Sequence, residues 1–190
     1  MSEVSRDDYR MTAEAFHAFL ADRPDWEKWE LIDGEAIVQA TPTKTHQIVI
    51  GNLIDQLYAA RRENGGSWQP LIGIGTRVRR DAHNEVVPDV MIMPPSDDAA
   101  IWTFDVLAAF EVLSPGSVRR DMVRKRDFYT RIESLTHYVV LAQDRREATV
   151  FARLDTFEPR RLSGGDARIE IPPLGISLAL SEVYRDTRVD

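Results

Sequence analysis

Cysteine is absent from the 190-residue sequence, so disulfide bonds and thiolate zinc sites are excluded. Long apolar runs are absent as well, because no uninterrupted stretch approaches the roughly 18 residues of a membrane-spanning helix. Residues 1–8 lack the apolar segment of a signal peptide. We therefore expect a cytoplasmic protein with no membrane association.

An excess of positive charge is also lacking, because 24 lysine and arginine residues stand against 31 aspartate and glutamate residues, a formal net charge of −7. This balance argues against a broad surface that coats nucleic acid without specificity. Positive charge is concentrated in two segments, residues 77–80 and 119–131. Each segment is compatible with a local basic groove and also with a solvated face.

The length and composition fit one domain, residues 1–190, with an ordered core from about residue 10 to about residue 185. Hydrophobic periodicity and turn residues predict helices at 13–21, 46–63 and 118–129, a hairpin at 29–32 and 35–38, strands at 68–80, 86–93, 106–113, 136–141, 147–152 and 168–171, and a capping segment at 176–183. The strand at 68–80 is expected to pair antiparallel with the strand at 86–93. The strand, helix and strand between 106 and 141 predict a parallel crossover, so the expected class is α/β (α+β) with a mixed sheet.

Two carboxylates interrupt the apolar runs at 86–93 and 106–113, namely Asp89 and Glu111. Burying an ionised carboxylate without a partner is costly, so these groups must be paired, bound to metal or open to solvent at strand ends. Magnesium takes oxygen ligands and is often held by one or two protein carboxylates together with substrate phosphate. Two acids on neighbouring strands suit that role.

Lys125 interrupts an apolar helical stripe, since Val118, Met122, Tyr129 and Ile132 share its face. The pattern therefore directs this lysine back toward the sheet that carries Asp89 and Glu111, while the neighbouring arginines can be solvated. Near a metal and a phosphate, such a lysine could orient water and neutralise developing negative charge. An inert ion pair with one of the carboxylates, or a side chain that reaches past the stripe to water, fits the same pattern.

Other chemistries find less support. Ser114 follows an apolar run, but the segment lacks the first glycine of a nucleophile elbow, which argues against an esterase. Four histidines, at positions 17, 46, 83 and 137, show no metal-ligand spacing. His46 is expected on or near the buried face in the first turn of its helix, where a histidine is more often a core or capping group than a ligand.

Several segments together resemble the Uma-type restriction endonuclease family, part of the PD-(D/E)xK nuclease superfamily. These are residues 29–35, the helix start at His46-Gln47, 88–90, 111–115, 121–129, 137–140 and 174–178. The resemblance implies a restriction endonuclease-like fold, in which helices flank a central mixed sheet, and a metal-dependent phosphodiesterase site. It also implies DNA as the substrate and a homodimer as the active assembly.

Carried over to this sequence, the resemblance makes Asp89 and Glu111 ligands of Mg²⁺ (or Mn²⁺), with Glu30 as an additional acid. The superfamily lysine usually lies two residues after the second acid, a position that Leu113 occupies here, and Lys125 on the following helix takes its place. His46 and Tyr129 match family positions to which we assign no role.

The leading hypothesis is accordingly a Mg²⁺-dependent DNA endonuclease that uses Asp89, Glu111, Lys125 and Glu30. The alternative is a catalytically inactive module that keeps the same fold and binds nucleic acid or protein. Net negative charge and the leucine at position 113 motivate this alternative.

Overall fold

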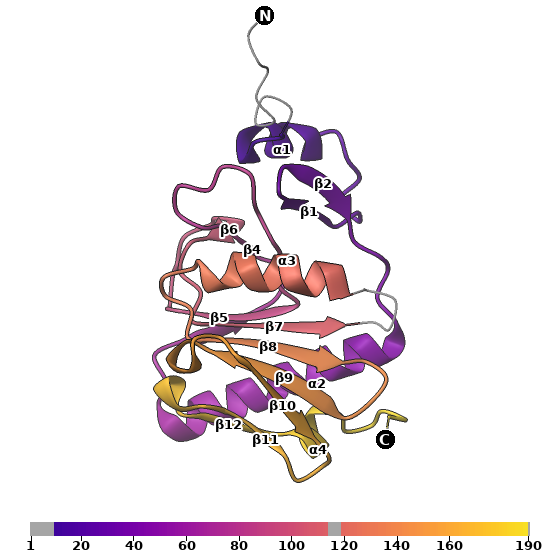
Figure 1. Ribbon diagram of the computed structural model, residues 1–190, viewed down its shortest axis with the longest axis vertical. Helices are drawn as coiled ribbons and strands as arrows, with labels where there is room; N and C mark the ends of the chain where they lie inside the picture. The colour runs from indigo at the N-terminus through magenta and orange to yellow at the C-terminus, as the bar shows by residue number, and fades with distance from the viewer. Residues whose placement is uncertain (1–9, 114–118, 190) are drawn as a thin grey trace, which may run out of the picture.

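The computed structural model describes residues 10–113 and 119–189, and its centre is a six-stranded mixed sheet (Figure 1). The strand order is β10-β9-β8-β7-β5-β3, and the only parallel pair in this sheet is β7 with β8. The strands are β3 (Gln69–Leu71), β5 (Val90–Met93), β7 (Ala108–Leu113), β8 (His137–Ala142), β9 (Glu147–Ala152) and β10 (Pro159–Ser163).

The parallel pair arises because helix α3 (Arg119–Thr130) carries the chain from the end of β7 back to the start of β8. A parallel connection must return along the whole strand, and a helix is the usual means. This confirms the parallel crossover and the mixed sheet predicted from the sequence.

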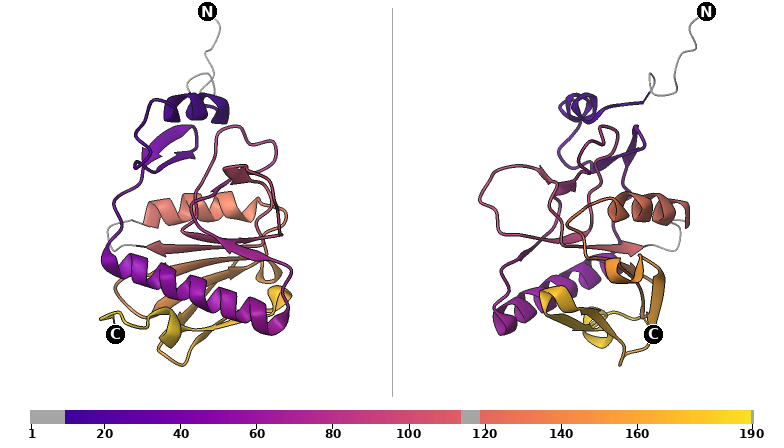
Figure 2. Two further views of the ribbon diagram at one scale, coloured as in Figure 1. Left: turned by 180° about the vertical axis from the view of Figure 1, so that it is seen from behind. Right: turned by 60° about the vertical axis from the view of Figure 1, so that its left-hand side comes forward.

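Two helices cover opposite faces of the sheet. Helix α3 lies on one face (Figure 1), and α2 (Lys44–Asn64) crosses the other, as the view from behind shows (Figure 2). Successive strand residues point to opposite faces, so Phe110 packs in the core cluster that includes Leu53 of α2. Its neighbour Ala109 packs in the cluster that includes Phe128 of α3. The sheet therefore separates two cores.

An amino-terminal unit lies beyond α3, away from the sheet (Figure 1). It contains α1 (Ala13–Leu20) and the hairpin of β1 (Trp29–Ile32) and β2 (Glu35–Val38). The Thr12 side chain caps α1 by accepting a hydrogen bond from the amide of its third residue, as expected of an N-cap threonine. In the hairpin turn, Gly34 has a φ of 79°, a left-handed conformation that glycine adopts without strain. The predicted helix and hairpin are thus present.

The carboxyl-terminal part adds a small antiparallel sheet of β11 (Arg168–Ile171) and β12 (Ile176–Ala179), followed by α4 (Leu180–Val183). Strand β12 and helix α4 both contact α2, so this part extends the core on the α2 face. Two short 3-10 helices occur at Arg153–Asp155 and Pro172–Leu174. None of the helices in the described part of the chain has the length and apolar character needed to cross a membrane.

The prediction of one long strand at 68–80 was wrong. The chain turns at Gly73, whose φ is +73°, and this turn divides the segment into β3 and β4 (Gly75–Thr76). Strand β3 pairs antiparallel with β5, whereas β4 pairs parallel with β6 (Trp102–Thr103) in a separate two-stranded sheet. Antiparallel pairing with the 86–93 segment therefore holds for β3 but not for the continuous strand that we expected.

The apolar run at 86–93 is also shorter as a strand than predicted, since β5 begins at Val90. Pro88 has no backbone N–H for a sheet ladder, and Val86 makes only an isolated bridge to Thr76. Helix α2 begins at Lys44, two residues before the predicted start. The predicted turn at 114–117 and the helix position Val118 lie outside the described residues.

Candidate active site

Three carboxylates from three separate elements converge at the carboxyl-terminal half of β7. Glu30 lies on β1, Asp89 directly precedes β5, and Glu111 lies on β7. In the antiparallel register of β5 and β7, Val90 pairs with Phe110, so the next step along both strands brings Asp89 beside Glu111. The Glu30 and Glu111 side chains are about 4% and 5% exposed, whereas that of Asp89 is 21% exposed. Asp89 is therefore the most accessible of the three acids from solution.

Lys125 joins two of these carboxylates. Its Nζ lies 3.0 Å from Oε1 of Glu30 and 3.0 Å from Oε1 of Glu111, and the lysine side chain is only about 10% exposed. The helical stripe had predicted this inward direction, and Lys125, Tyr129 and Ile132 are indeed buried on one face of α3. The structure thus brings together the four residues to which the sequence analysis assigned catalysis.

Hydrogen bonds fix the orientation of each carboxylate. Glu30 Oε1 accepts from the backbone N–H of Val87 at 2.9 Å, and Asp89 Oδ2 accepts from the backbone N–H of Val112 at 2.8 Å. The Tyr129 hydroxyl donates to Glu111 Oε1 at 2.8 Å. Charge-assisted bonds of this kind are stronger than those between neutral groups, so the acids are held in place.

His46 approaches the remaining oxygen of Asp89, with Nε2 3.3 Å from Oδ1. The histidine lies in the first turn of α2, where its backbone N–H donates to the capping side chain of Thr43. The prediction that His46 sits near the buried face is confirmed, because its side chain is only 14% exposed. Both residues without an assigned role, His46 and Tyr129, therefore contact a site carboxylate.

The charges in this cluster perturb one another strongly. Burial raises the pKa of Glu111, Lys125 opposes that rise, and the charges of Asp89 and Glu30 add to it, so the pKa of Glu111 reaches about 8. Burial lowers the pKa of Lys125, but Glu111 and Glu30 outweigh it and raise the pKa above its usual value. Lys125 is therefore protonated at neutral pH, and the cluster has more carboxylates than lysines to balance them.

An excess of buried oxygen donors is the chemistry that a hard divalent cation requires. In the described part of the chain, no group of three or more histidine, aspartate or glutamate side chains is arranged to enclose a metal. Asp89, just before β5, and Glu111, on the adjacent strand β7, instead fit an open site in which one or two carboxylates hold Mg²⁺ and the other positions stay free. Glu111 Oε1 already accepts from Lys125 and Tyr129, so metal binding at that oxygen would compete with two hydrogen bonds.

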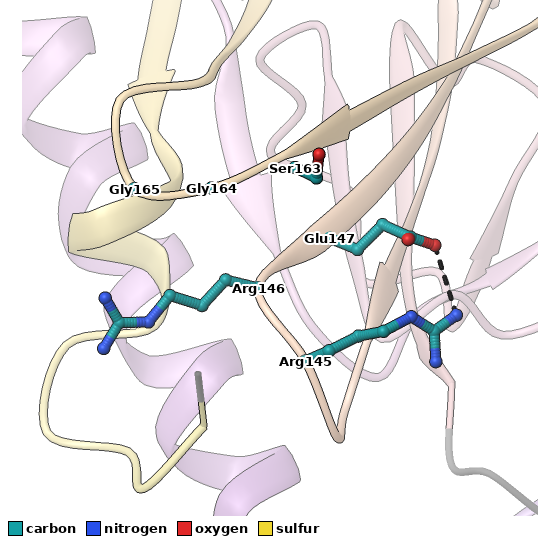
Figure 3. Close-up of a pocket in the computed structure, with 6 residues that line it drawn as sticks. All are labelled: Arg145, Arg146, Glu147, Ser163, Gly164 and Gly165. Carbon is teal, nitrogen blue, oxygen red and sulfur yellow. Dashed lines mark hydrogen bonds and ion pairs between the residues drawn. The ribbon is translucent and has the colours of Figure 1, made fainter.

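Two hollows among the described residues lie away from this cluster. One, of about 420 Å³, is lined by the β8–β9 turn and the segment after β10, with Arg145, Arg146, Glu147, Ser163, Gly164 and Gly165. In Figure 3 the Arg145 side chain runs toward Glu147 while that of Arg146 extends the other way, so the two guanidinium groups do not converge. This hollow lacks the converging polar groups of a binding site.

The other hollow, of about 370 Å³, brings together members of both basic segments of the sequence, namely Arg77, Arg79 and Arg131. Each guanidinium is already paired with an acid: Glu85 with Arg77, Asp105 with Arg79, and Asp81 with Arg131. The expected local concentration of arginine is therefore present in space, but the charge of each of these three side chains is largely balanced.

Sequence reasoning missed the backbone donors of Val87 and Val112, because main-chain groups leave no trace in a side-chain pattern. It also missed a buried network in which Glu85 Oε2 contacts His17 Nε2 at 2.9 Å and the guanidinium of Arg77. The available sequence signal was Glu85, a charged residue directly before the apolar run at 86–93. This network anchors α1 to the rest of the chain, since His17 lies on α1.

Comparisons with known proteins show which fold and which family this chain is similar to. A solved structure of "a putative nuclease belonging to DUF820" from Anabaena variabilis is similar, with a TM-score of 0.74, 13% identity, and coverage of 92% of this chain and 97% of that chain. At this identity the likeness establishes the fold alone. A search of curated proteins found no match. The sequence model of the family described as "Uma2: Putative restriction endonuclease" matches residues 13–181. That span is most of the chain, and the protein therefore belongs to the Uma2 family.

Proposed function

We propose that this protein is a divalent-metal-dependent endonuclease that hydrolyses DNA phosphodiester bonds. The observation that carries the proposal is the convergence of Asp89, Glu111, Glu30 and Lys125, with both amine contacts at 3.0 Å. Membership of a family described as restriction endonucleases supports the same reaction class.

Asp89 and Glu111 would hold Mg²⁺ or Mn²⁺, which supplies Lewis-acid activation of the phosphate and of the attacking water when bound. The structure limits what the protein groups can do beside it. Because the pKa of Lys125 is raised, its ammonium cannot take a proton from water near neutral pH. Its role is instead to orient water and to stabilise negative charge that develops on the phosphate oxygens. Glu30 is a second carboxylate in contact with the ammonium, in addition to Glu111, and so helps to fix its position.

The test is cleavage of plasmid DNA by the purified protein with Mg²⁺ or Mn²⁺, compared with Asp89→Asn. This substitution keeps the shape and the ability to accept from Val112 but removes the charge. We expect at least about a 100-fold loss of cleavage rate, since a metal-site carboxylate is lost. Asp105→Asn is the matched control, because Asp105 is 57% exposed and pairs with surface Arg79, and its rate should equal that of the unaltered protein. Cleavage that survives in Asp89→Asn, or that is insensitive to a chelator, would overturn the proposal.

One observation favours a second candidate, an inactive module of the same fold. Lys125 and Tyr129 both bond directly to Glu111 Oε1, an arrangement that also suits an inert ion pair. Calorimetric titration with Mn²⁺ separates the two candidates. Saturable binding that disappears in Glu111→Ala counts against the inactive module, whereas no binding by the unaltered protein counts for it.

A further inference from the structure

The hydroxyl of Tyr138 is buried and has no hydrogen-bond partner. It is one of three such side-chain atoms among the described residues, and the ring is 0% exposed. A buried hydroxyl without a partner has lost its bonds to water and gained none, which lowers stability. Phenylalanine would fill the same space without this penalty, so the hydroxyl calls for an explanation.

Tyr138 stands on the face of the sheet that carries Glu111. In the parallel pairing of β7 and β8, Tyr138 lies opposite Ala109, and Val140, two residues on, lies opposite Glu111. Residues two apart in a strand share a face. The small side chain of Ala109 leaves room for the Tyr138 ring to pack against Tyr129, with ring centroids 4.6 Å apart.

The site carboxylates act on this hydroxyl electrostatically. Burial raises the pKa of Tyr138 well above its usual value, and the charges of Glu111, Glu30 and Asp89 raise it further. The Tyr138 hydroxyl therefore keeps its proton at neutral pH. It can donate a hydrogen bond to a carboxylate that comes within reach.

The donors already present at the carboxylates are committed. Glu111 Oε1 accepts from Lys125 and Tyr129, and Glu30 Oε1 accepts from Lys125 and the Val87 N–H. If Lys125 turns to a substrate phosphate, both carboxylates lose the same donor at once. The protonated, unpartnered hydroxyl of Tyr138 on the same face of the sheet would restore one of the two bonds.

We propose that Tyr138 is a positioning residue. When Lys125 engages the substrate, the Tyr138 hydroxyl donates a hydrogen bond to the carboxylate of Glu111 or Glu30 in its place. The inference rests on the proposed nuclease function and adds a role for a residue that touches neither metal nor substrate. It explains why a group that destabilises the resting protein stands at this place.

The experiment compares Tyr138→Phe with Tyr129→Phe and with Tyr58→Phe, whose side chain on α2 is 39% exposed and remote from the cluster. For each protein, kcat and KM for DNA cleavage with Mn²⁺, the affinity for Mn²⁺ by calorimetry and the metal-free melting temperature are measured. We expect Tyr138→Phe to lower kcat about tenfold, as for one hydrogen bond to a charged group, with KM unchanged. Its melting temperature should equal or exceed that of the unaltered protein. Tyr129→Phe loses a formed hydrogen bond and should lower both kcat and the melting temperature. Tyr58→Phe should change neither kcat nor the melting temperature.

A Tyr138→Phe protein whose kcat stays within about twofold of the unaltered value overturns the inference. So does a loss of kcat that comes with a fall in melting temperature, because that pattern indicates packing. If the unaltered protein cleaves nothing, the proposed function fails and the inference, which rests on it, fails with it. If the unaltered protein cleaves and Tyr138→Phe cleaves equally well, the inference alone fails. The Mn²⁺ affinity of Tyr138→Phe should equal that of the unaltered protein, because without substrate Lys125 stays on both carboxylates; a weaker affinity would show that the hydroxyl supports the metal site directly and would overturn the proposed role.

Discussion

The two faces of the central strands differ in kind, although alternate residues of the same short segments form both. On the α2 face, the side chains of Phe110, Val112 and Leu141 point into a large cluster of buried hydrophobic residues. On the α3 face, the intervening positions include Glu111 and Tyr138. Strand alternation thus lets one short segment supply a core on one side and ionisable groups on the other.

Stability and chemistry are therefore concentrated on different faces of the sheet. Apolar burial on the α2 face does not itself depend on pH, because the side chains of its hydrophobic cluster carry no charge between pH 5 and pH 9. On the α3 face, burial of Glu111 and Lys125 opposes their charged forms, and their mutual attraction only partly offsets this. Stability should therefore depend on pH through the Glu111 and Lys125 cluster of the α3 face and not through the hydrophobic cluster of the α2 face.

The largest effect is expected from Phe110→Ala on the α2 face. The ring is 0% exposed and central in its cluster, so its removal should lower the free energy of unfolding by about 3–5 kcal/mol. The loss should be the same at pH 5 and pH 9, since no ionisable group is involved. Denaturant titrations at both pH values measure it, with Val123→Ala, at a position that is 49% exposed on α3, as a control that shifts stability by about 0.5 kcal/mol or less. A loss that varied with pH would show that the faces are coupled.

A second effect, confined to the α3 face, is expected when the pH of the metal-free protein is raised. The pKa of Glu111 is about 8 in the folded protein, against 4.5 as its ordinary value. Between these values the folded chain keeps a proton that the unfolded chain has released. The contribution to stability is therefore fully present below pH 4.5 and is lost progressively as the pH rises through 8.

Glu111→Gln provides the check, because glutamine keeps the shape and does not titrate. Unfolding in the presence of a chelator, measured from pH 5 to pH 9, should show a flatter dependence for this variant than for the unaltered protein. Identical slopes would mean that another group causes the pH dependence. Phe110→Ala, at the next position of the strand, should keep the slope of the unaltered protein.

Much of the fold was predictable because its signals are local. The hairpin around Gly34, the N-cap at Thr12 and the crossover through α3 each follow from residues close together in the sequence. The long strand at 68–80 failed because a single left-handed residue, Gly73, redirects the chain. Strand β10 (Pro159–Ser163) was missed because it is an exposed edge strand of mainly polar residues and so lacks an apolar pattern.

The candidate site was predictable to the extent that ionised side chains interrupt apolar patterns. Asp89, Glu111 and Lys125 stood out for that reason, and their proximity followed from strand pairing and helical phase. Glu30 has no such signal within its strand, and only family resemblance singled it out. The partners that fix these groups are backbone N–H groups and a tyrosine hydroxyl, and their positions depend on tertiary structure that no periodicity encodes.

The smallest effect is expected from Arg124→Ala, immediately before Lys125. Arg124 points from α3 toward the β1–β2 hairpin, 3.9 Å from Asp33 and 3.6 Å from Glu35, and its side chain is 38% exposed. Exposed ion pairs contribute little, so its loss should change the free energy of unfolding by about 0.5 kcal/mol or less. The effect should shrink further in 1 M salt, where charges are screened over about 3 Å. Thermal unfolding of Arg124→Ala and Lys125→Ala in low and high salt compares the two positions. Removal of the buried Lys125 leaves two carboxylates without their partner, and because that site is shielded from solvent, the loss should not depend on salt. Equal losses for the two neighbours would mean that Arg124 does more than pair at the surface, and that it helps to hold the hairpin that supplies Glu30.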